Sequence, residues 1–351
     1  MPRVLKKLIH GVMGLPGVSN AIRLANSGPA VLFYHGVEEQ LKNPKVQMLH
    51  LPLVDFEKQI LHLRKSCEIV SLDEVYDNIS NSRQMDPRQL AITFDDGYKN
   101  NLEVVEPLLS SYDIPFAVFV STRHISEGLR FASYYVRAAI YESTAPQIMV
   151  LGERLDVSTD VSRQRAMQVL LKQIKTQKQD TVDEIVQDLI RSMPEDRWAE
   201  LNERYSSDQP MNWDDVKELG QRGVTIGSHC HDHLILHDKQ CISEIDRQLR
   251  TSKELLQKHV GDCRYIAYPN GGMNDLSQEA VKRVSRYYSA GFMTVPGEVQ
   301  PDTNRYVLPR ICGDTTEMGR FRFAINARFR HNKRNRSWMS AAGFQDAELP
   351  A

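Results

Sequence analysis

Several features are scarce or absent in this sequence, and each absence narrows what the chain can be. Its 351 residues contain five scattered cysteines, and no two of them form a C-x-x-C pair. An odd, unpatterned set argues against a disulfide scaffold and favours a reducing compartment. No apolar run reaches the ~18 residues that a membrane-spanning helix needs. Basic residues (44) nearly balance acidic ones (45), so the composition gives no sign of nucleic-acid binding or of disorder.

Basic and apolar residues gather at both ends of the chain. Residues 1–28 form an expected amphipathic segment, in which His10 interrupts the apolar stretch and no small-residue cleavage site follows, so we expect no signal peptide. Residues 319–351 form an expected tail with seven basic and no acidic residues between 320 and 336. These ends predict a cytoplasmic protein that contacts the inner face of the membrane peripherally. The equal alternative is that both ends pack on the domain.

Short apolar runs alternate with amphipathic stretches through most of residues 29–318, which we expect to form one domain. The expected strands are residues 30–35, 68–72, 90–94, 114–120, 224–229, 264–268 and 288–294. The expected helices include residues 56–63, 72–79, 242–260 and 277–285, with another that begins after a capping asparagine at 212. Ser71 is the expected cap of the helix at residues 72–79. Repeated strand–helix units of this kind favour a parallel sheet.

One stretch, at about residues 125–210, breaks this alternation. It contains two polar, amphipathic helical patterns, at residues 161–176 and 181–193. We expect a helical insertion, placed where a lid or a substrate-shaping wall could form.

Two apolar runs end in residues that can bind a metal. Residues 91–98 contain Asp95 and Asp96, and residues 224–233 end in a group of histidines. The carboxyl ends of parallel strands meet on one face, which would bring the two runs together. Because side chains alternate along extended backbone, one aspartate can bind a metal while the other faces a water molecule. One carboxylate with two imidazoles is the ligand set of a metal hydrolase, whereas the first run alone would be read as an ordinary Asp-Gly turn.

The choice among the histidines stays open on spacing alone. His229 and His233 are four residues apart, a spacing that suits chelation from one side of a helical turn. His231 and His237 are also near. The position of His229 at the strand end favours it as the first ligand. We expect His231 to be exposed or outside the ligand shell, and His237 to lie on the surface.

These runs resemble the motifs of the polysaccharide deacetylase family, which shares the NodB homology domain. Residues 93–98 (Thr-Phe-Asp-Asp-Gly-Tyr) resemble its first motif, residues 229–233 its second, and residues 267–271 (Ala-Tyr-Pro-Asn-Gly) its third. The resemblance covers about residues 30–314 apart from the insertion. It implies an α/β fold, a distorted (β/α) barrel of fewer than eight parallel strands.

The resemblance also implies roles for the matching residues. Asp95 would be the catalytic base. Asp96, His229 and His233 would bind a divalent metal ion, for which zinc is the default and other divalent ions are not excluded. In the third motif, Tyr268, Pro269 and Asn270 would face the substrate, and the backbone N–H of Asn270 would stabilise the oxyanion.

The sequence departs from the common family pattern at two functions, the arginine that orients the base and the histidine that acts as the catalytic acid. Other residues are candidates for both. The arginine of the third motif is absent, so Arg310 is a candidate to orient the base, with a structural surface arginine as an equal alternative. No Leu-x-His motif follows Pro309. The run that ends in Tyr34 and His35 instead resembles the exopolysaccharide deacetylase branch, which implies that His35 is the catalytic acid. An imidazole suits that task because its pKa lies near neutrality, although a buried structural histidine remains the alternative.

The sequence therefore predicts a metal-dependent hydrolase that removes N-acetyl groups from amino sugars of a polysaccharide or glycolipid. The expected partner is an N-acetylated glycan or a lipid-linked saccharide, and no nucleic acid. Two alternatives remain: a deacylase, for example a deformylase, of a lipid-linked amino sugar, and a non-catalytic carbohydrate-binding protein with a degenerate site.

Overall fold

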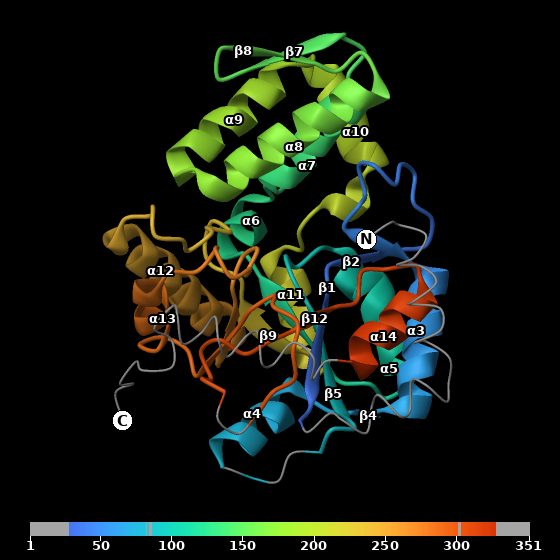
Figure 1. Cartoon of the computed structure of the whole chain (residues 1–351), viewed down its shortest axis with the longest axis vertical. Helices are drawn as coiled ribbons and strands as arrows, with labels where there is room; N and C mark the ends of the chain where they lie inside the picture. Colours follow the sequence, from blue (N-terminus) through green and yellow to red (C-terminus); the bar gives the residue numbers. More distant parts are fainter. Residues whose placement is uncertain (1–27, 82, 84–85, 301–302, 328–351) are drawn as a thin grey trace.

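A curled parallel sheet forms the centre of the computed structural model, which describes residues 28–81, 83, 86–300 and 303–327 (Figure 1). Seven strands follow one another in the order β11-β10-β9-β6-β5-β1-β12, and every pairing is parallel. They are β1 (Ala30–Tyr34), β5 (Gln89–Phe94), β6 (Phe116–Val120), β9 (Thr225–Ser228), β10 (Tyr265–Ala267), β11 (Ala290–Phe292) and β12 (Ile311–Cys312). The short strand β4 (Glu68–Ile69) pairs beside this path with the beginning of β5. The expected fold, a distorted (β/α) barrel with fewer than eight strands along its path, is confirmed.

The central strands are apolar on both faces because both faces are covered. All residues of β1, β5 and β6 are buried, as parallel strands packed beneath helices require. The register pairs Ala30 with Leu90 and continues to Tyr34 with Phe94, so β1 and β5 end at the same level. The side chains that follow these two strands therefore emerge next to each other.

The segment before β12 joins the two edges of the sheet. Leu308 bridges to Phe292 of β11, and the Met293 N–H donates a hydrogen bond of 2.8 Å to the Leu308 carbonyl. Three residues later, β12 pairs with β1, with Leu32 opposite Ile311. Arg310 lies between these two pairings and is thereby carried to the end of the barrel where β5 terminates.

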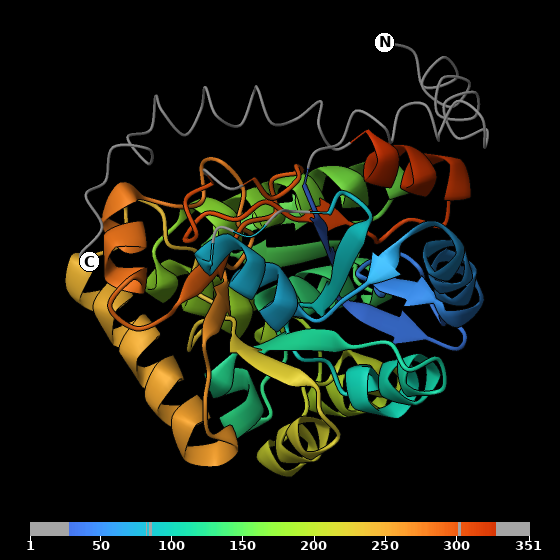
Figure 2. The same cartoon turned by 90° about the horizontal axis from the view of Figure 1, so that it is seen from below.

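Helices surround the outside of the sheet (Figure 2). They are α3 (Leu53–Ser66), α4 (Leu72–Ser80), the π-helical turn η1 (Asn101–Val105) with α5 (Glu106–Ser110), α11 (Trp213–Gln221), α12 (Ile242–Val260), α13 (Gln278–Val284) and α14 (Met318–Asn326). Ser71 caps α4 by accepting the Glu74 N–H, and Asn212 caps α11 in a capping box, both as predicted. A separate parallel pair, β2 (Gly36–Glu38) with β3 (His50–Pro52), was not expected from the sequence.

The expected insertion lies above the carboxyl ends of the strands (Figure 1). It contains α6 (Thr122–Glu127), α7 (Ala132–Glu142), α8 (Asp160–Thr176), α9 (Gln179–Arg191), α10 (Glu195–Arg204) and the 3-10 turn η2 (Ser206–Asp208). Its apolar residues form a cluster of their own, which includes Leu170, Ile185, Leu189 and Leu201. An antiparallel hairpin of β7 (Gln147–Val150) and β8 (Glu153–Asp156) was not predicted.

The ends of the chain are described only in part. Phe321 and Ile325 of α14 are buried in the main core, so the segment that begins at residue 319 starts with a packed helix. The rest of the expected tail and the expected amphipathic segment lie outside the described residues. Among the helices that are described, none is both long and apolar enough to cross a membrane.

Candidate active site

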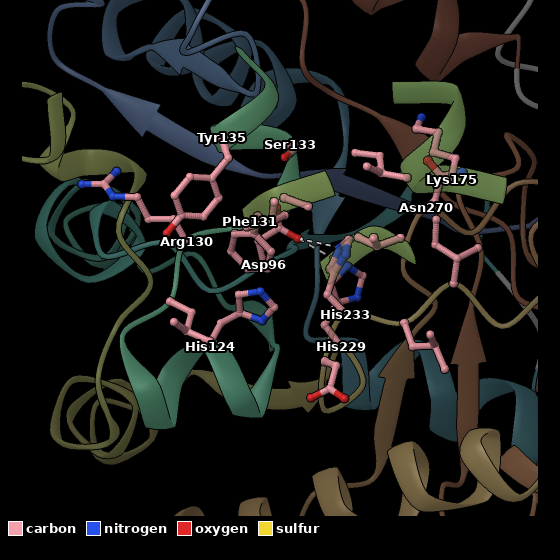
Figure 3. A pocket seen from close by; sticks show the side chains of 18 of the residues that line it. Asp96, His124, Arg130, Phe131, Ser133, Tyr135, Lys175, His229, His233 and Asn270 are labelled. Carbon is pink, nitrogen blue, oxygen red and sulfur yellow. Dashed lines mark ion pairs between the residues drawn. The ribbon is translucent and has the colours of Figure 1, made fainter. Parts of the chain in front are cut away.

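Most of the site residues predicted from the sequence meet in one cavity of about 810 Å³ between the barrel and the insertion (Figure 3). The barrel side of this cavity is formed by residues that follow β1, β5, β9 and β10. They include His35, Asp95, Asp96, His229, His233 and Asn270. A position at the carboxyl ends of parallel strands is where such folds build their ligand sites.

A carboxylate and two imidazoles form the centre of the site. One ligand atom from each of Asp96, His229 and His233 lies within 4.8 Å of the others. Asp96 Oδ1 is 3.5 Å from His229 Nε2 and 3.3 Å from His233 Nε2. Asp96 and His233 both adopt left-handed backbone conformations, with φ of 72° and 57°. Strain of this kind persists where the surrounding structure holds a functional group in place.

The chemistry of these atoms fits a divalent cation. Asp96 Oδ1 is buried and has no hydrogen-bond partner among the described residues, which is costly for a carboxylate oxygen unless another ligand satisfies it. His229 donates its Nδ1–H to the Ala267 carbonyl at 2.8 Å, which fixes the tautomer and leaves the Nε2 lone pair directed at the centre. Burial lowers the pKa of His229 to about 4, so its imidazole is neutral at pH 7, as a metal ligand must be.

Asp95 is held by an arginine rather than by the histidines. Arg310 Nη1 and Nη2 each donate a hydrogen bond of 2.7 Å to the two Asp95 carboxylate oxygens, and Nη1 also donates to Thr93 Oγ1 at 3.1 Å. Arg310 is completely buried and is therefore not a surface residue. Burial alone would raise the pKa of the Asp95 carboxyl, but the Arg310 charge, helped by nearby histidines, brings that pKa below its usual range. Asp95 is an oriented, ionised carboxylate.

His35 faces the same cavity and is paired with Asp314. Its Nδ1 lies 2.6 Å from Asp314 Oδ2, so Nδ1 is the donor and Nε2 is the nitrogen left for other partners. Burial lowers the pKa of His35, but the Asp314 carboxylate outweighs it and raises the pKa to about 9. Asp314 was not recognised in the sequence. It follows β12, which neighbours β1, so the rule that points to strand ends would have found it if β12 had been recognised.

Of the third motif, only Asn270 lines the cavity. Asn270 has φ of 60° and is held by Asp275, which accepts its side-chain amide at 2.5 Å. No hydrogen bond joins the Asn270 backbone N–H to any described residue. Tyr268 is buried and donates its hydroxyl to the Tyr306 carbonyl at 2.6 Å, and Pro269 is buried as well. Neither residue is part of the cavity lining, so the structure does not bring them to the substrate side.

Three other histidines near the cluster have different surroundings. His231 is partly exposed and its Nδ1 is 2.8 Å from Thr122 Oγ1, outside the ligand cluster. His237 is buried, which corrects the expectation of a surface position. His124, which the sequence did not single out, stacks on Phe131 with 4.2 Å between ring centroids. The Phe131 ring in turn contacts the His233 ring edge-on at 5.2 Å, so these two side chains support a ligand of the cluster.

Comparisons with known proteins show the family to which the chain belongs. The sequence pattern of the polysaccharide deacetylase family matches residues 82–288, which is more than half of the chain. The protein YxkH of Bacillus subtilis (strain 168), named after the same family, is 30% identical over 97 residues. That match covers 27% of this chain and 34% of YxkH, so the chain spans about a third of this curated relative.

Solved structures share the fold at low sequence identity. IcaB from Ammonifex degensii has a TM-score of 0.55 at 17% identity, over 86% of this chain and 98% of IcaB. The Streptococcus pyogenes deacetylase PplD, in complex with acetate, has a TM-score of 0.51 at 18% identity, over 81% of this chain and 91% of PplD. The matched range includes Asp95, Asp96, His229 and His233, and these residues converge in one cavity of the barrel. The chain therefore belongs to the polysaccharide deacetylase family.

Proposed function

We propose that this chain is a metal-dependent hydrolase that removes N-acetyl groups from amino sugars of a polysaccharide or glycolipid. The observation that carries the proposal is the convergence of distinct groups in one cavity. These are a cluster suited to a metal ion, an ionised carboxylate, a protonated imidazole and an unpaired backbone N–H. Amide hydrolysis needs groups of these kinds. Membership of the polysaccharide deacetylase family supports the same reaction.

Asp96, His229 and His233 would hold the cation. Zinc is our first choice because two imidazoles and one carboxylate belong to its usual ligands and leave a position open. When bound, such an ion lowers the pKa of a coordinated water molecule and polarises the acetyl carbonyl.

The protein's own groups carry the proton transfers. Asp95, fixed by Arg310, accepts a proton from the attacking water molecule on a carboxylate oxygen. The Asn270 N–H donates a hydrogen bond to the carbonyl oxygen as negative charge develops on it. His35, protonated at neutral pH, gives its Nε2 proton to the amide nitrogen as the C–N bond breaks. The products are a free amino sugar and acetate.

The direct test is acetate release from N-acetylated amino sugars, followed by mass spectrometry with and without a chelator. We expect release to stop when the metal is removed and to return when zinc is added. Release of formate from an N-formyl sugar, with no acetate from the N-acetyl sugar, would instead identify a deformylase. If acetate release persists in Asp96→Ala after chelation, the proposed role of the metal cluster is wrong.

We also propose that the protein works at the cytoplasmic surface of an anionic membrane, because basic residues gather at both ends of the sequence. The expected result is sedimentation with anionic liposomes at low salt and release at high salt, since salt screens such attraction. Phe321 and Ile325 belong to the core, so the informative truncation ends after Ala327 and keeps α14. If the truncated and full chains bind equally, residues 328–351 play no part in membrane contact.

A further inference from the structure

The insertion contributes an aliphatic surface to the cavity that holds the metal cluster. Two residues of α8, Leu171 and Ile174, and two of α9, Val186 and Ile190, line that cavity. Their spacings of three and four residues place each pair on one side of its helix. We call these four residues the apolar roof.

The apolar roof is only half covered by the protein. Leu171, Ile174 and Ile190 pack against the insertion's own hydrophobic cluster yet remain partly exposed, and Val186 is partly exposed as well. Across the same cavity, Met48 is 55% exposed. Aliphatic surface on both sides of one cavity costs free energy in water, and that cost is removed when an apolar ligand covers it.

The polar side chains of the cavity have a different distribution. The metal cluster and its neighbours Asp95 and His35 lie on the barrel side. The insertion side also carries polar groups beside the roof, among them His124, Glu127, Lys175, Gln177, Asp183 and Gln187. Figure 3 shows Lys175 and Asn270 among the side chains around the cluster. A sugar ring presents hydroxyl groups, and placing these against Leu, Ile and Val without hydrogen bonds is unfavourable. The barrel side suits the sugar, whereas the apolar roof suits a hydrocarbon chain.

We propose that the apolar roof binds an alkyl or isoprenoid chain attached to the acetylated amino sugar, so that the substrate is a glycolipid and not a free polysaccharide. This inference rests on the proposed function and narrows its substrate class. The hydrocarbon chain of the substrate lies on the aglycone side of the sugar, because the acetyl group has to reach the buried cluster of Asp96, His229 and His233. The cavity of about 810 Å³ lies in the upper part of the range of small-molecule sites and has room for more than the sugar.

The test compares two glycosides of N-acetylglucosamine, one with a methyl and one with an octyl aglycone, both kept below the micelle concentration. Acetate release gives KM and kcat, and calorimetry gives Kd independently of turnover. Each methylene that is fully buried strengthens binding about fourfold, so we expect KM and Kd at least tenfold lower for the octyl glycoside. An N-octanoyl methyl glycoside serves as the third ligand and reports whether the roof instead takes the acyl group.

Two variants and one matched control locate the effect. Ile174→Asn and Val186→Thr place polar atoms in the apolar roof, and we expect the octyl advantage, which is the ratio of the methyl KM to the octyl KM within each variant, to fall roughly fivefold or more. Val169→Thr makes the same Val-to-Thr change on an exposed part of α8 that does not line the cavity, and should leave both glycosides unaffected. A circular dichroism spectrum like that of the wild type shows that each variant is folded.

The outcomes separate this inference from the proposed function. If the methyl glycoside is hydrolysed and the octyl chain gives no gain, the glycolipid inference is overturned and the proposed function stands. If neither glycoside is hydrolysed but the octyl glycoside binds tightly, and less tightly to Val186→Thr, the proposed function fails and the apolar subsite holds. Preferential binding of the N-octanoyl sugar would assign the roof to the acyl group and overturn the inference.

Discussion

The barrel and the insertion contribute to the same cavity in different ways. The barrel supplies the charged groups, and two of them are held by partners from distant parts of the chain, Asp95 by Arg310 and His35 by Asp314. The insertion supplies aliphatic side chains supported by a hydrophobic cluster of its own. Reactive groups need fixed partners because an unpaired buried charge is costly, whereas an apolar surface needs only support from behind. On the functions proposed above, the barrel would carry out the reaction and the insertion would select the substrate.

The largest effects should come from the barrel. We expect Asp96→Ala and His229→Ala each to abolish metal binding and to lower kcat by about a thousandfold or more, because each removes a metal ligand and the charge stabilisation that it supports. Asp95→Asn should lower kcat about 10² to 10⁴-fold while the metal stays bound, since a general base is lost but no ligand is removed. Metal content per chain, measured by elemental analysis beside kcat, distinguishes the two classes. If Asp95→Asn also lost the metal, the distinction between Asp95 as the base and Asp96 and His229 as metal ligands would be wrong.

An intermediate, pH-dependent effect is expected at the pair of His35 and Asp314. His35 has to be protonated to act as an acid, so activity is lost as the pH rises through its pKa of about 9. Asp314→Asn removes the carboxylate that raises this pKa, and a return to the ordinary value near 6.5 would leave about 3% of the imidazole protonated at pH 8. We therefore expect roughly a 30-fold loss of kcat at pH 8 and little loss at pH 6.

A pH–rate profile of wild type and Asp314→Asn, with metal content as the control, is the measurement. An equal loss at every pH would mean that Asp314 supports the structure but does not set the charge of His35. An unchanged profile in His35→Ala would return that histidine to a structural role.

The smallest effect on the reaction, but a clear effect on stability, is expected within the insertion. Leu170 is 1% exposed in the insertion cluster, so Leu170→Ala should lower the free energy of unfolding by about 2–5 kcal/mol. The neighbouring Val169 is 43% exposed, and Val169→Ala should change the free energy of unfolding by less than about 0.5 kcal/mol. Urea unfolding followed by circular dichroism gives both values. Metal content should be unchanged in Leu170→Ala, and a loss of metal would show that the two regions are not independent.

Local sequence patterns predicted the frame of the barrel well. The short apolar runs of β1, β5 and β6 alternate with amphipathic stretches, which is typical of a covered parallel sheet, and the capping residues Ser71 and Asn212 mark where their helices begin. Asp95, Asp96 and His229 were singled out because they directly follow apolar runs that read as strands, whereas the choice of His233 rested on the resemblance to the family's second motif. These signals are local, so the sequence contains them without any knowledge of the tertiary structure.

The missed features depend on contacts between distant residues. β12 has only two residues, and its pairing with β1 has no periodic signal of its own. Asp314 and His35 are 279 residues apart, so nothing in the sequence near either one reveals the pair. Tyr268 illustrates the opposite error, since its place in a motif suggested a role in the cavity but its hydroxyl is used by Tyr306 in the core.

The closing segment of the sheet has a consequence for synthesis of the protein on the ribosome. Arg310 and Asp314 come late in the chain, 215 and 279 residues after the groups that they hold, Asp95 and His35. The metal-binding residues, in contrast, have all emerged once residue 233 has left the exit tunnel. A nascent chain that ends before residue 310 therefore carries the proposed metal ligands, and the Ala267 carbonyl that orients His229, but lacks the partners of the proposed base and acid. Because a domain generally folds as a unit, we expect hydrolytic competence only after the last strand has been made.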